Sequence, residues 1–372
     1  MARIDPFEME RMQSLWWHLV DVDLSESGVQ PMSIRDLLGP LADAEAFVGT
    51  RLGYPLSEGS HETRANIAAW YEGATPEHVT VTNGGSEANL LALWTLLEPG
   101  DRLAFMLPNY LQGKGLGPFF GERTDTFKLK LRDGRWSLDV DRLARVVTKK
   151  TKVVMVCNPN NPTGAVLTEG EMDAIVGAAE RVGAWIVSDE IYRGAEVDAE
   201  VSSPTFWGRY DRVVITSGLS KAFAMPGLRV GWIVAPPEVI REVWIRHDYT
   251  TLTPGMISDA LAAFAMQPEV RENILARTRA IIRTNLPPLE EWIAANGDLL
   301  TYVRPVAGAI AYLKYDLPER STALVDRIRQ EQSVLLVPGD MLGLGRGFRV
   351  GFGFGLEQMR KGLERVGNAL RG

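Results

Sequence analysis

The segment RVVITSGLSKAFAMPGLRVGWIVA (residues 212–235) contains the pattern that decides the fold. Its two apolar, β-branched runs, 212–217 and 229–235, are typical of strands, and a connection rich in glycine and small residues separates them. Comparable strand-like runs occur earlier in the chain, at 79–82, 102–107, 152–157 and 184–188. Helical stretches lie between several of these runs. This alternation predicts an α/β fold with a mostly parallel central sheet that helices cover on both faces.

The chain outside this sheet has its own pattern. Thr168, followed by Glu171, predicts a capping box that opens a helix through about Val182. A long helical stretch is expected from about Ser258 through Thr284, and the chain beyond it mixes strands with helices, as in a smaller α+β unit. The predicted parts are an N-terminal segment that packs with the small domain, a large domain and a small C-terminal domain, at residues 1–34, 35–257 and 258–372.

Composition excludes several classes of protein. The chain has 372 residues, beyond the ~250–300 at which a single core stops growing, and it is 45% hydrophobic and 23% charged, unlike disordered, collagenous or coiled-coil chains. A net charge of −7 argues against nucleic acid or an anionic membrane as the main partner. No apolar run approaches the ~18–20 residues that span a bilayer, and the charged N-terminus lacks a signal core, so a cytoplasmic location is expected. One cysteine, Cys157, excludes an internal disulfide, and four scattered histidines argue against a metal site.

Ligands of such sheets bind beyond the carboxyl ends of the strands, where this chain is polar or rich in glycine. The first strand is followed by NGGS (83–86) and a helix start, whose free N–H groups suit a phosphate, although glycine also serves many plain turns. Asp189 and Tyr192 follow another strand. A carboxylate there can hold a proton on a partner nitrogen or cap a turn. Arg349, among apolar and glycine neighbours, must meet an anion, either an internal carboxylate or a ligand.

Two further segments contain residues that could react with or bind a ligand. A desolvated lysine at 221 can form a Schiff base with an aldehyde, and Arg229 can bind a phosphate through two N–H groups. A solvated surface lysine is the alternative, but the small and apolar neighbours of Lys221 argue against it. In NPNNPTG (158–164), a cis Asn161–Pro162 bond would aim the Asn161 amide into the cleft, whereas a plain loop would not.

In this order, the glycine loop, an aromatic residue, Asn-Pro-Thr-Gly, Asp-x-x-Tyr, Ser-Lys and two arginines resemble the fold type I, class I/II aminotransferases, which use pyridoxal 5′-phosphate (PLP). The resemblance extends from about Gly28 to Arg349, and NPTG and SKxxxxxGxRxG are its most diagnostic strings. It implies the PLP-dependent transferase fold. It also implies an enzyme that moves an amino group from an L-amino acid to a 2-oxo acid through aldimine and quinonoid intermediates.

The resemblance assigns the catalytic groups. Lys221 would carry PLP and later act as general base between the substrate α-carbon and the cofactor. Asp189 would keep the pyridinium nitrogen protonated, which makes the ring an electron sink. Tyr192 and Asn161 would hydrogen-bond the ring oxygen, and Tyr110 would stack on the ring face.

The resemblance also assigns binding residues. Those implied for the phosphate are Gly84, Gly85, Ser86, Ser220 and Arg229. Tyr54, in GYPLSEG, would reach the phosphate of a neighbouring subunit, so the resemblance implies a homodimer with shared active sites. Arg349 would bind the substrate α-carboxylate beside Asn161, and Gly28 would close over it. One position departs from the pattern, because many relatives have Ser or Thr where this chain has Gly218. Either that phosphate contact is missing or Ser217 replaces it.

A narrower resemblance, to capreomycidine synthase-like members, keeps a second reaction open. It lies in SESGVQP (25–31), LSKAFAMPGLRVGW (219–232), IRHDYTTLTP (245–254) and VLLVPGDMLGLGRGFRVGFG (334–353). Those enzymes keep the scaffold but cyclise a hydroxylated arginine, so a PLP-dependent lyase or cyclase on an arginine-derived substrate is the alternative. A catalytically inactive PLP-fold binding protein is a further one, against which the retained lysine and aspartate argue. No arginine can be assigned to a distal carboxylate, so dicarboxylate specificity is unsupported.

Overall fold

A computed structural model of the chain describes residues 4–39 and 44–372. Its largest sheet has eight strands in the order β2-β9-β8-β7-β6-β3-β4-β5. These strands are β2 (Val79–Thr82), β3 (Arg102–Leu107), β4 (Arg123–Arg132), β5 (Arg135–Leu138), β6 (Thr151–Cys157), β7 (Trp185–Asp189), β8 (Val213–Gly218) and β9 (Gly231–Val234). The strands from β8 to β4 in this order run parallel, whereas β9 is antiparallel to both neighbours and β5 to β4. The predicted α/β class with a mostly parallel sheet is confirmed.

Helices cover both faces of this sheet because successive residues of its strands point to opposite sides. In β3, Phe105 packs in a core with α5 (Gly85–Leu96), α6 (Gln112–Phe120) and α9 (Pro237–His247), whereas its neighbour Met106 packs in the core that includes α8 (Glu169–Glu180). α7 (Val140–Val146) contacts α8 and β4. The predicted capping box of α8 is present, with Thr168 and Glu171 bonded reciprocally.

A second, antiparallel sheet forms in the C-terminal part, with the order β10-β11-β14-β13. Its strands are β10 (Leu300–Tyr302), β11 (Ile310–Tyr315), β13 (Val337–Pro338) and β14 (Phe348–Gly351). Two helices, α12 (Ser321–Gln332) and α13 (Leu356–Arg371), pack beside it. The N-terminal strand β1 (Val22–Asp23) pairs in parallel with β12 (Val334–Leu335) of this C-terminal part. The beginning of the chain is therefore hydrogen-bonded to a segment more than 300 residues later.

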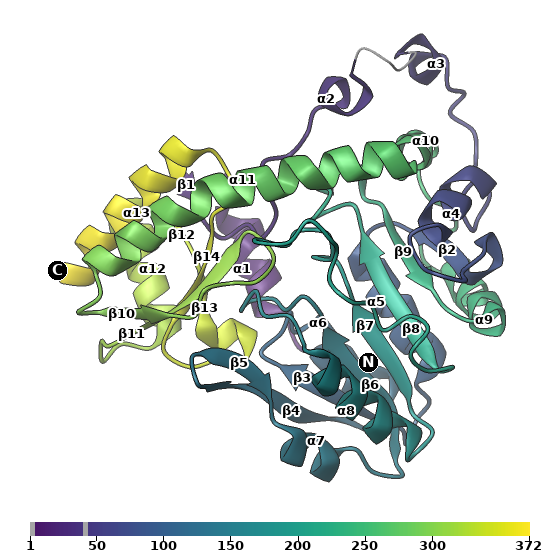
Figure 1. The fold of residues 1–372 in the computed structure, drawn as a ribbon, viewed down its shortest axis with the longest axis horizontal. Helices are drawn as coiled ribbons and strands as arrows, with labels where there is room; N and C mark the ends of the chain where they lie inside the picture. Colours follow the sequence, from purple (N-terminus) through teal and green to yellow (C-terminus); the bar gives the residue numbers. More distant parts are fainter. Residues whose placement is uncertain (1–3, 40–43) are drawn as a thin grey trace.

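The predicted long helix at 258–284 is two helices, α10 (Met256–Ala265) and α11 (Pro268–Ala295). The break occurs because Pro268 has no N–H to donate and stands at the first turn of α11, after an extended Gln267. Past residue 284, α11 continues through Pro287 and Pro288 to Ala295. Figure 1 shows α11 running along the molecule from the side of the large sheet to the side of the small one.

The remaining helices are α1 (Glu8–Trp16), α2 (Ile34–Leu38), α3 (Ala44–Val48) and α4 (His61–Ala68). In Figure 1, α2 and α3 stand away from the body of the molecule, whereas α1 lies between the two sheets. Within the described ranges, no helix is long and apolar enough to cross a lipid bilayer. The strands β6, β7 and β8 end near the start of α5, and this edge of the large sheet carries the candidate site.

Candidate active site

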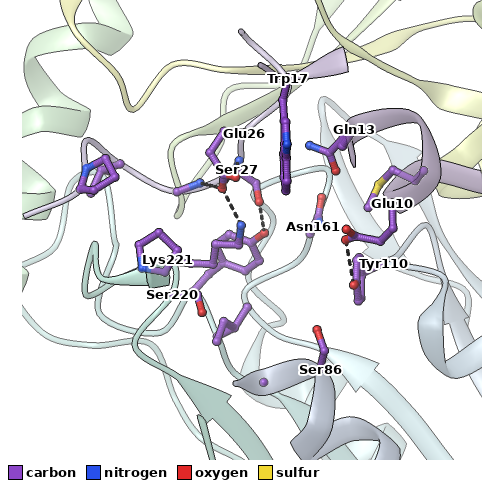
Figure 2. Close-up of a pocket in the computed structure, with 18 of the residues that line it drawn as sticks. Glu10, Gln13, Trp17, Glu26, Ser27, Ser86, Tyr110, Asn161, Ser220 and Lys221 are labelled. Atoms are coloured by element: carbon purple, nitrogen blue, oxygen red, sulfur yellow. Dashed lines mark hydrogen bonds and ion pairs between the residues drawn. The ribbon is translucent and has the colours of Figure 1, made fainter. Parts of the chain in front are cut away.

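A cavity of about 740 Å³ lies at the carboxyl ends of β6, β7 and β8 (Figure 2). It brings together most of the residues predicted from the sequence: Gly28, Gly85, Ser86, Tyr110, Asn161, Asp189, Tyr192, Ser220, Lys221, Arg229 and Arg349. We call the part formed by Ser86, Asn161, Asp189, Lys221 and Arg229 the cavity floor. These five residues come from four different strand ends and one helix start, so the sheet edge assembles them.

Two predicted residues lie elsewhere. Tyr54 is 84% exposed and does not line the cavity. Gly84 lies behind the cavity surface and adopts a positive φ of 96°. A Cβ atom at this position would lie 2.3 Å from Nη2 of Arg229, so glycine at 84 is what lets the guanidinium approach the start of α5.

Asp189 ends β7 with both carboxylate oxygens hydrogen-bonded. Oδ1 accepts from the backbone N–H of Ile191 (3.1 Å) and Oδ2 from Nδ2 of Asn89 (3.0 Å). Thr216 in turn donates to the Asn89 oxygen (2.6 Å), which fixes the amide orientation. Burial raises the pKa of Asp189 above its usual value, and the hydrogen bond from Asn89 acts in the opposite direction. A buried carboxylate of this kind gains most from a cationic N–H partner in the cavity.

Lys221 follows β8, and its side chain is only 23% exposed. Its Nζ lies 2.5 Å from Oε1 of Glu26, a residue near the N-terminus. Gly28 packs against the same lysine, since a Cβ there would be 3.7 Å from Cδ of Lys221 and 3.3 Å from the Ser220 carbonyl oxygen. The alternative of a solvated surface lysine is therefore wrong.

The start of α5 forms the positive end of the cavity. No side chain caps this helix start, so the N–H groups of Gly85 and Ser86 stay available to a bound anion, whereas the Glu87 N–H donates to the Gly84 carbonyl oxygen (3.1 Å). Arg229 adds its charge from an αL backbone conformation, with φ 53°. Ser217 was the candidate to replace the Ser or Thr side chain that many relatives have at the position of Gly218. Its buried hydroxyl donates to the Glu190 carbonyl oxygen (3.2 Å). Gly218 itself has no room for a side chain, because a Cβ would lie 2.7 Å from the Val230 oxygen.

Asn161 and Tyr192 both have partners within the chain. The Asn161–Pro162 peptide bond is cis, as predicted. Oδ1 of Asn161 accepts from Nη1 of Arg349 (2.8 Å), and the Tyr192 hydroxyl donates to Oγ of Ser27 (2.9 Å). Burial raises the pKa of Tyr192, so its hydroxyl stays a protonated donor at neutral pH.

Arg349 is a buried cation on β14, with 1% of its surface exposed. Besides Asn161, it donates to the Ser25 carbonyl oxygen, while its Nε has no hydrogen-bond partner. Across the described ranges, no carboxylate lies within ion-pair distance of its guanidinium. Burial lowers its pKa. Of the two anions that the sequence left open, the described residues supply no carboxylate in direct contact, although Glu26 and Asp23 act on Arg349 at longer range, and a ligand carboxylate would supply that contact.

The residues that close the cavity from the N-terminal side have no role predicted from the sequence. We call Glu10, Gln13, Trp17, Glu26 and Ser27 the N-terminal wall; all five line the cavity and are labelled in Figure 2. The Tyr110 hydroxyl donates to Oε1 of Glu10 (2.9 Å), which ties α1 to the segment that follows β3. Glu26 and Ser27 lie in SESGVQP (25–31), which carried only the narrower resemblance, and no motif marked Glu10, Gln13 or Trp17. Asn89 was also missed, although its place one helical turn after Gly85 was a usable signal.

Comparisons with known proteins agree with this geometry. The family model for aminotransferase class I and II matches residues 40–366. Capreomycidine synthase of Streptomyces vinaceus is 30% identical over 94% of this chain and 89% of its own length, and an aspartate/prephenate aminotransferase of Thermus thermophilus is 31% identical over 80% and 76%. Among solved structures, a PLP-dependent aminotransferase from Streptococcus suis superposes with a TM-score of 0.92 (30% identity; 99% and 98% covered). The PLP-dependent cyclase OrfR superposes with a TM-score of 0.89 at 30% identity, covering 100% of this chain and 98% of its own.

Proposed function

The chain belongs to the class I and II aminotransferase family, and from that premise we propose that it is a PLP-dependent aminotransferase acting on an L-amino acid and a 2-oxo acid. Members of this family are PLP-dependent enzymes that act on such substrates. The observation that carries the proposal is one cavity that contains a sequestered lysine, a buried carboxylate and the open start of a helix. These are the three groups that an aldehyde, a basic ring nitrogen and a phosphate require.

The fit of PLP is supported at both ends of the cavity. The phosphate would bind to the first N–H groups of α5, to the hydroxyls of Ser86 and Ser220, and to Arg229, for which Gly84 leaves the space. The ring nitrogen would bind to Asp189, whose pKa is raised by burial, so that a cationic N–H partner would stabilise its ionised form. Tyr110 would cover the ring, and Asn161 and Tyr192 would bind its oxygen.

When bound, PLP supplies an aldehyde that combines with amines and a ring that withdraws electrons from the substrate α-carbon. Lys221 would first hold the cofactor and then, once free, take the proton from the α-carbon and return it. Asp189 would hold the proton at the ring nitrogen, which keeps the ring electron-deficient. Arg349 would bind the substrate α-carboxylate with two parallel N–H groups and thereby fix the orientation of the α-carbon.

Three further predictions accompany this function. Tyr54 is exposed, as a residue that contributes to a neighbouring subunit would be, so we propose a homodimer with shared sites. We also propose the division into residues 1–34, 35–257 and 258–372, which two separate sheets support. A cytoplasmic location stays a prediction from the sequence.

A second candidate function, a PLP-dependent lyase or cyclase on an arginine-derived substrate, is favoured by the N-terminal wall. Gln13 uses its NH2 group on Ser25, which leaves its oxygen as an acceptor beside the Glu10 carboxylate. A guanidinium group carries five donors and no acceptor, so it complements this wall. The arginines that line the cavity in the described ranges are Arg229 and Arg349, so no free arginine remains for a distal carboxylate.

One experiment tests both candidates. Purified protein should turn yellow with PLP, and each amino acid of a panel should then be added singly, with absorbance and product mass recorded. A transaminase leaves the cofactor as pyridoxamine phosphate after one half-reaction, whereas a lyase or cyclase restores the aldehyde form. In the second case, Glu10→Gln should weaken the binding of cationic amino acids more than the binding of neutral ones. A protein that stays colourless with added PLP contradicts both.

A further inference from the structure

Glu26 is the N-terminal wall residue that contacts a reacting atom. Its Oε1 lies 2.5 Å from the Nζ of Lys221, and both side chains are about four-fifths buried, at 20% and 23% exposure. Figure 2 shows Glu26 above the lysine, on the side of the cavity that faces away from the sheet. The family roles assigned above leave this carboxylate without a function.

The position of Glu26 is fixed by backbone contacts that do not involve the lysine. Oε1 also accepts from the backbone N–H groups of Ser27 (2.8 Å) and Gly28 (2.9 Å). The segment that carries it is bonded to β14 and the residues after it, through Gly351 N–H to Leu24 O (2.7 Å) and Gln30 N–H to Gly353 O (2.8 Å). The carboxylate is therefore held in place before any cofactor arrives, unlike a flexible surface partner.

The charge of Glu26 is permanent at neutral pH. Burial alone would raise its pKa, but the charge and hydrogen bond of Lys221, with the Gly28 N–H, outweigh burial and lower the pKa to about 2. Other charged or titratable groups line the same cavity from neighbouring elements. They are Asp189 on β7, Tyr192 after it, Cys157 on β6, Arg229 before β9, Arg349 on β14, Asp23 on β1, Tyr110 after β3, His18 after α1 and Glu10 on α1. In the described chain, Glu26 is the one carboxylate within ion-pair distance of Lys221.

We propose that Glu26 is the counter-ion of the Lys221 nitrogen and keeps it protonated at neutral pH, both in the cofactor-free protein and after this nitrogen has bonded to the PLP aldehyde. The second half rests on the proposed function. In that bond-forming step the ammonium first gives one proton to solvent, the free amine combines with the aldehyde with release of one water, and the bonded nitrogen takes one proton back from solvent. The positive charge that Glu26 stabilises makes the attached carbon more open to attack by the substrate amine.

The test is a spectrophotometric pH titration of PLP-loaded protein. Loss of the proton from the bonded nitrogen changes the absorbance, and removing a nearby opposite charge shifts such midpoints by roughly 1–3 pH units. Glu26→Gln should therefore lower the midpoint by about 1–3 units. Glu10→Gln is the matched control, because it removes one negative charge from the same wall but its partner is Tyr110. A Glu26→Gln midpoint equal to that of wild type, or an equal shift in the control, overturns the proposal.

A second measurement does not need the cofactor. Reductive methylation of cofactor-free protein across a pH series, with Lys221 followed by peptide mass spectrometry, reports when its amine is free. Glu26→Gln should reach half-labelling at lower pH than wild type, and identical curves overturn the proposal even if PLP never binds. If Glu26→Gln does not fold, Glu26→Asp takes its place, since the shorter side chain withdraws the charge from Nζ. The pH of half-labelling in Glu26→Asp should lie between the wild-type value and the value expected for Glu26→Gln. A labelling curve that does not shift contradicts the proposal.

Discussion

The cavity floor and the N-terminal wall reach the same cavity by different routes. Three floor residues follow parallel strands, Arg229 precedes the antiparallel β9 and Ser86 lies at a helix start, so neighbouring strand registers set most of their distances. The wall residues come from α1 and the segment after β1, and contacts with a strand more than 300 residues later hold them in place. The floor carries the groups to which the proposed function assigns the chemistry. The wall adds two carboxylates and an indole to the same cavity, so we expect it to govern selectivity.

The largest effect should come from the floor. Lys221→Ala removes the amine that holds the cofactor and moves the α-proton, so kcat should fall by at least about 10⁴-fold, as when a nucleophile is deleted. Borohydride reduction of PLP-loaded wild type should fix the cofactor to the peptide containing Lys221. The exposed Lys152 on β6 offers a control, since Lys152→Ala should keep full turnover. Substantial turnover in Lys221→Ala would break the distinction between floor and wall.

Asp189→Ala should have the next largest effect. Losing one preorganised electrostatic partner costs about 3–4 kcal/mol, or roughly 10²–10³ in kcat. Asn89→Ala removes only a hydrogen bond that orients this carboxylate, and its effect should be smaller. Steady-state kinetics with saturating PLP would measure both. Full activity in Asp189→Ala would mean that this residue does not serve the ring nitrogen.

Arg349→Lys tests the junction of the two regions, because this side chain bonds to Asn161 in the floor and to Ser25 beside the wall. Lysine keeps the charge but loses the paired N–H groups. KM for the amino acid should rise about 10–100-fold, the equivalent of one or two hydrogen bonds to a charged group, with PLP affinity unchanged. An equal loss of PLP affinity, measured by absorbance titration, would contradict a role in substrate binding.

The smallest effect should lie behind the floor, at Glu87. This carboxylate is buried and bonded to the Asn83 N–H and to Thr250 and Thr251, with His247 at 3.6 Å. Burial would raise its pKa, but these partners lower it to about 2. A carboxyl group whose pKa falls on folding stabilises the folded protein fully at pH values above its unfolded pKa, near 4.3. This stabilisation is lost as the pH falls through the folded pKa.

The stability difference between wild type and Glu87→Gln should therefore be about 1–3 kcal/mol at pH 7 and shrink between about pH 5 and pH 2. Urea unfolding at several pH values would measure it, with turnover checked in parallel. A difference that does not change with pH would mean that the ionised form of Glu87 is not what the surrounding groups stabilise.

The sequence predicted the floor because its residues stand where apolar runs end, and those runs were visible from local patterns. Strands at 79–82 and 102–107 were predicted to the residue. Local patterns do not reveal which distant segments pair, so the contact of Lys221 with Glu26, 195 residues apart, was missed. The β4–β5 hairpin was missed as well, because β4 is largely polar and exposed and gives no apolar run. Pro268 was a readable break within the long helix, and overlooking it merged α10 with α11.

The glycines near the end of the chain have a consequence for synthesis. A Cβ at Gly351 would lie 1.8 Å from the Glu26 carbonyl oxygen, and one at Gly353 would lie 2.2 Å from that of Gly28. The segment that holds the lysine's counter-charge thus packs only against β14 and the residues after it, and the separation in sequence between Ser25 and Arg349 is 324. Contacts so distant in sequence form late. The nascent chain can therefore assemble the sheet that bears the reactive amine well before it can close the chamber around it.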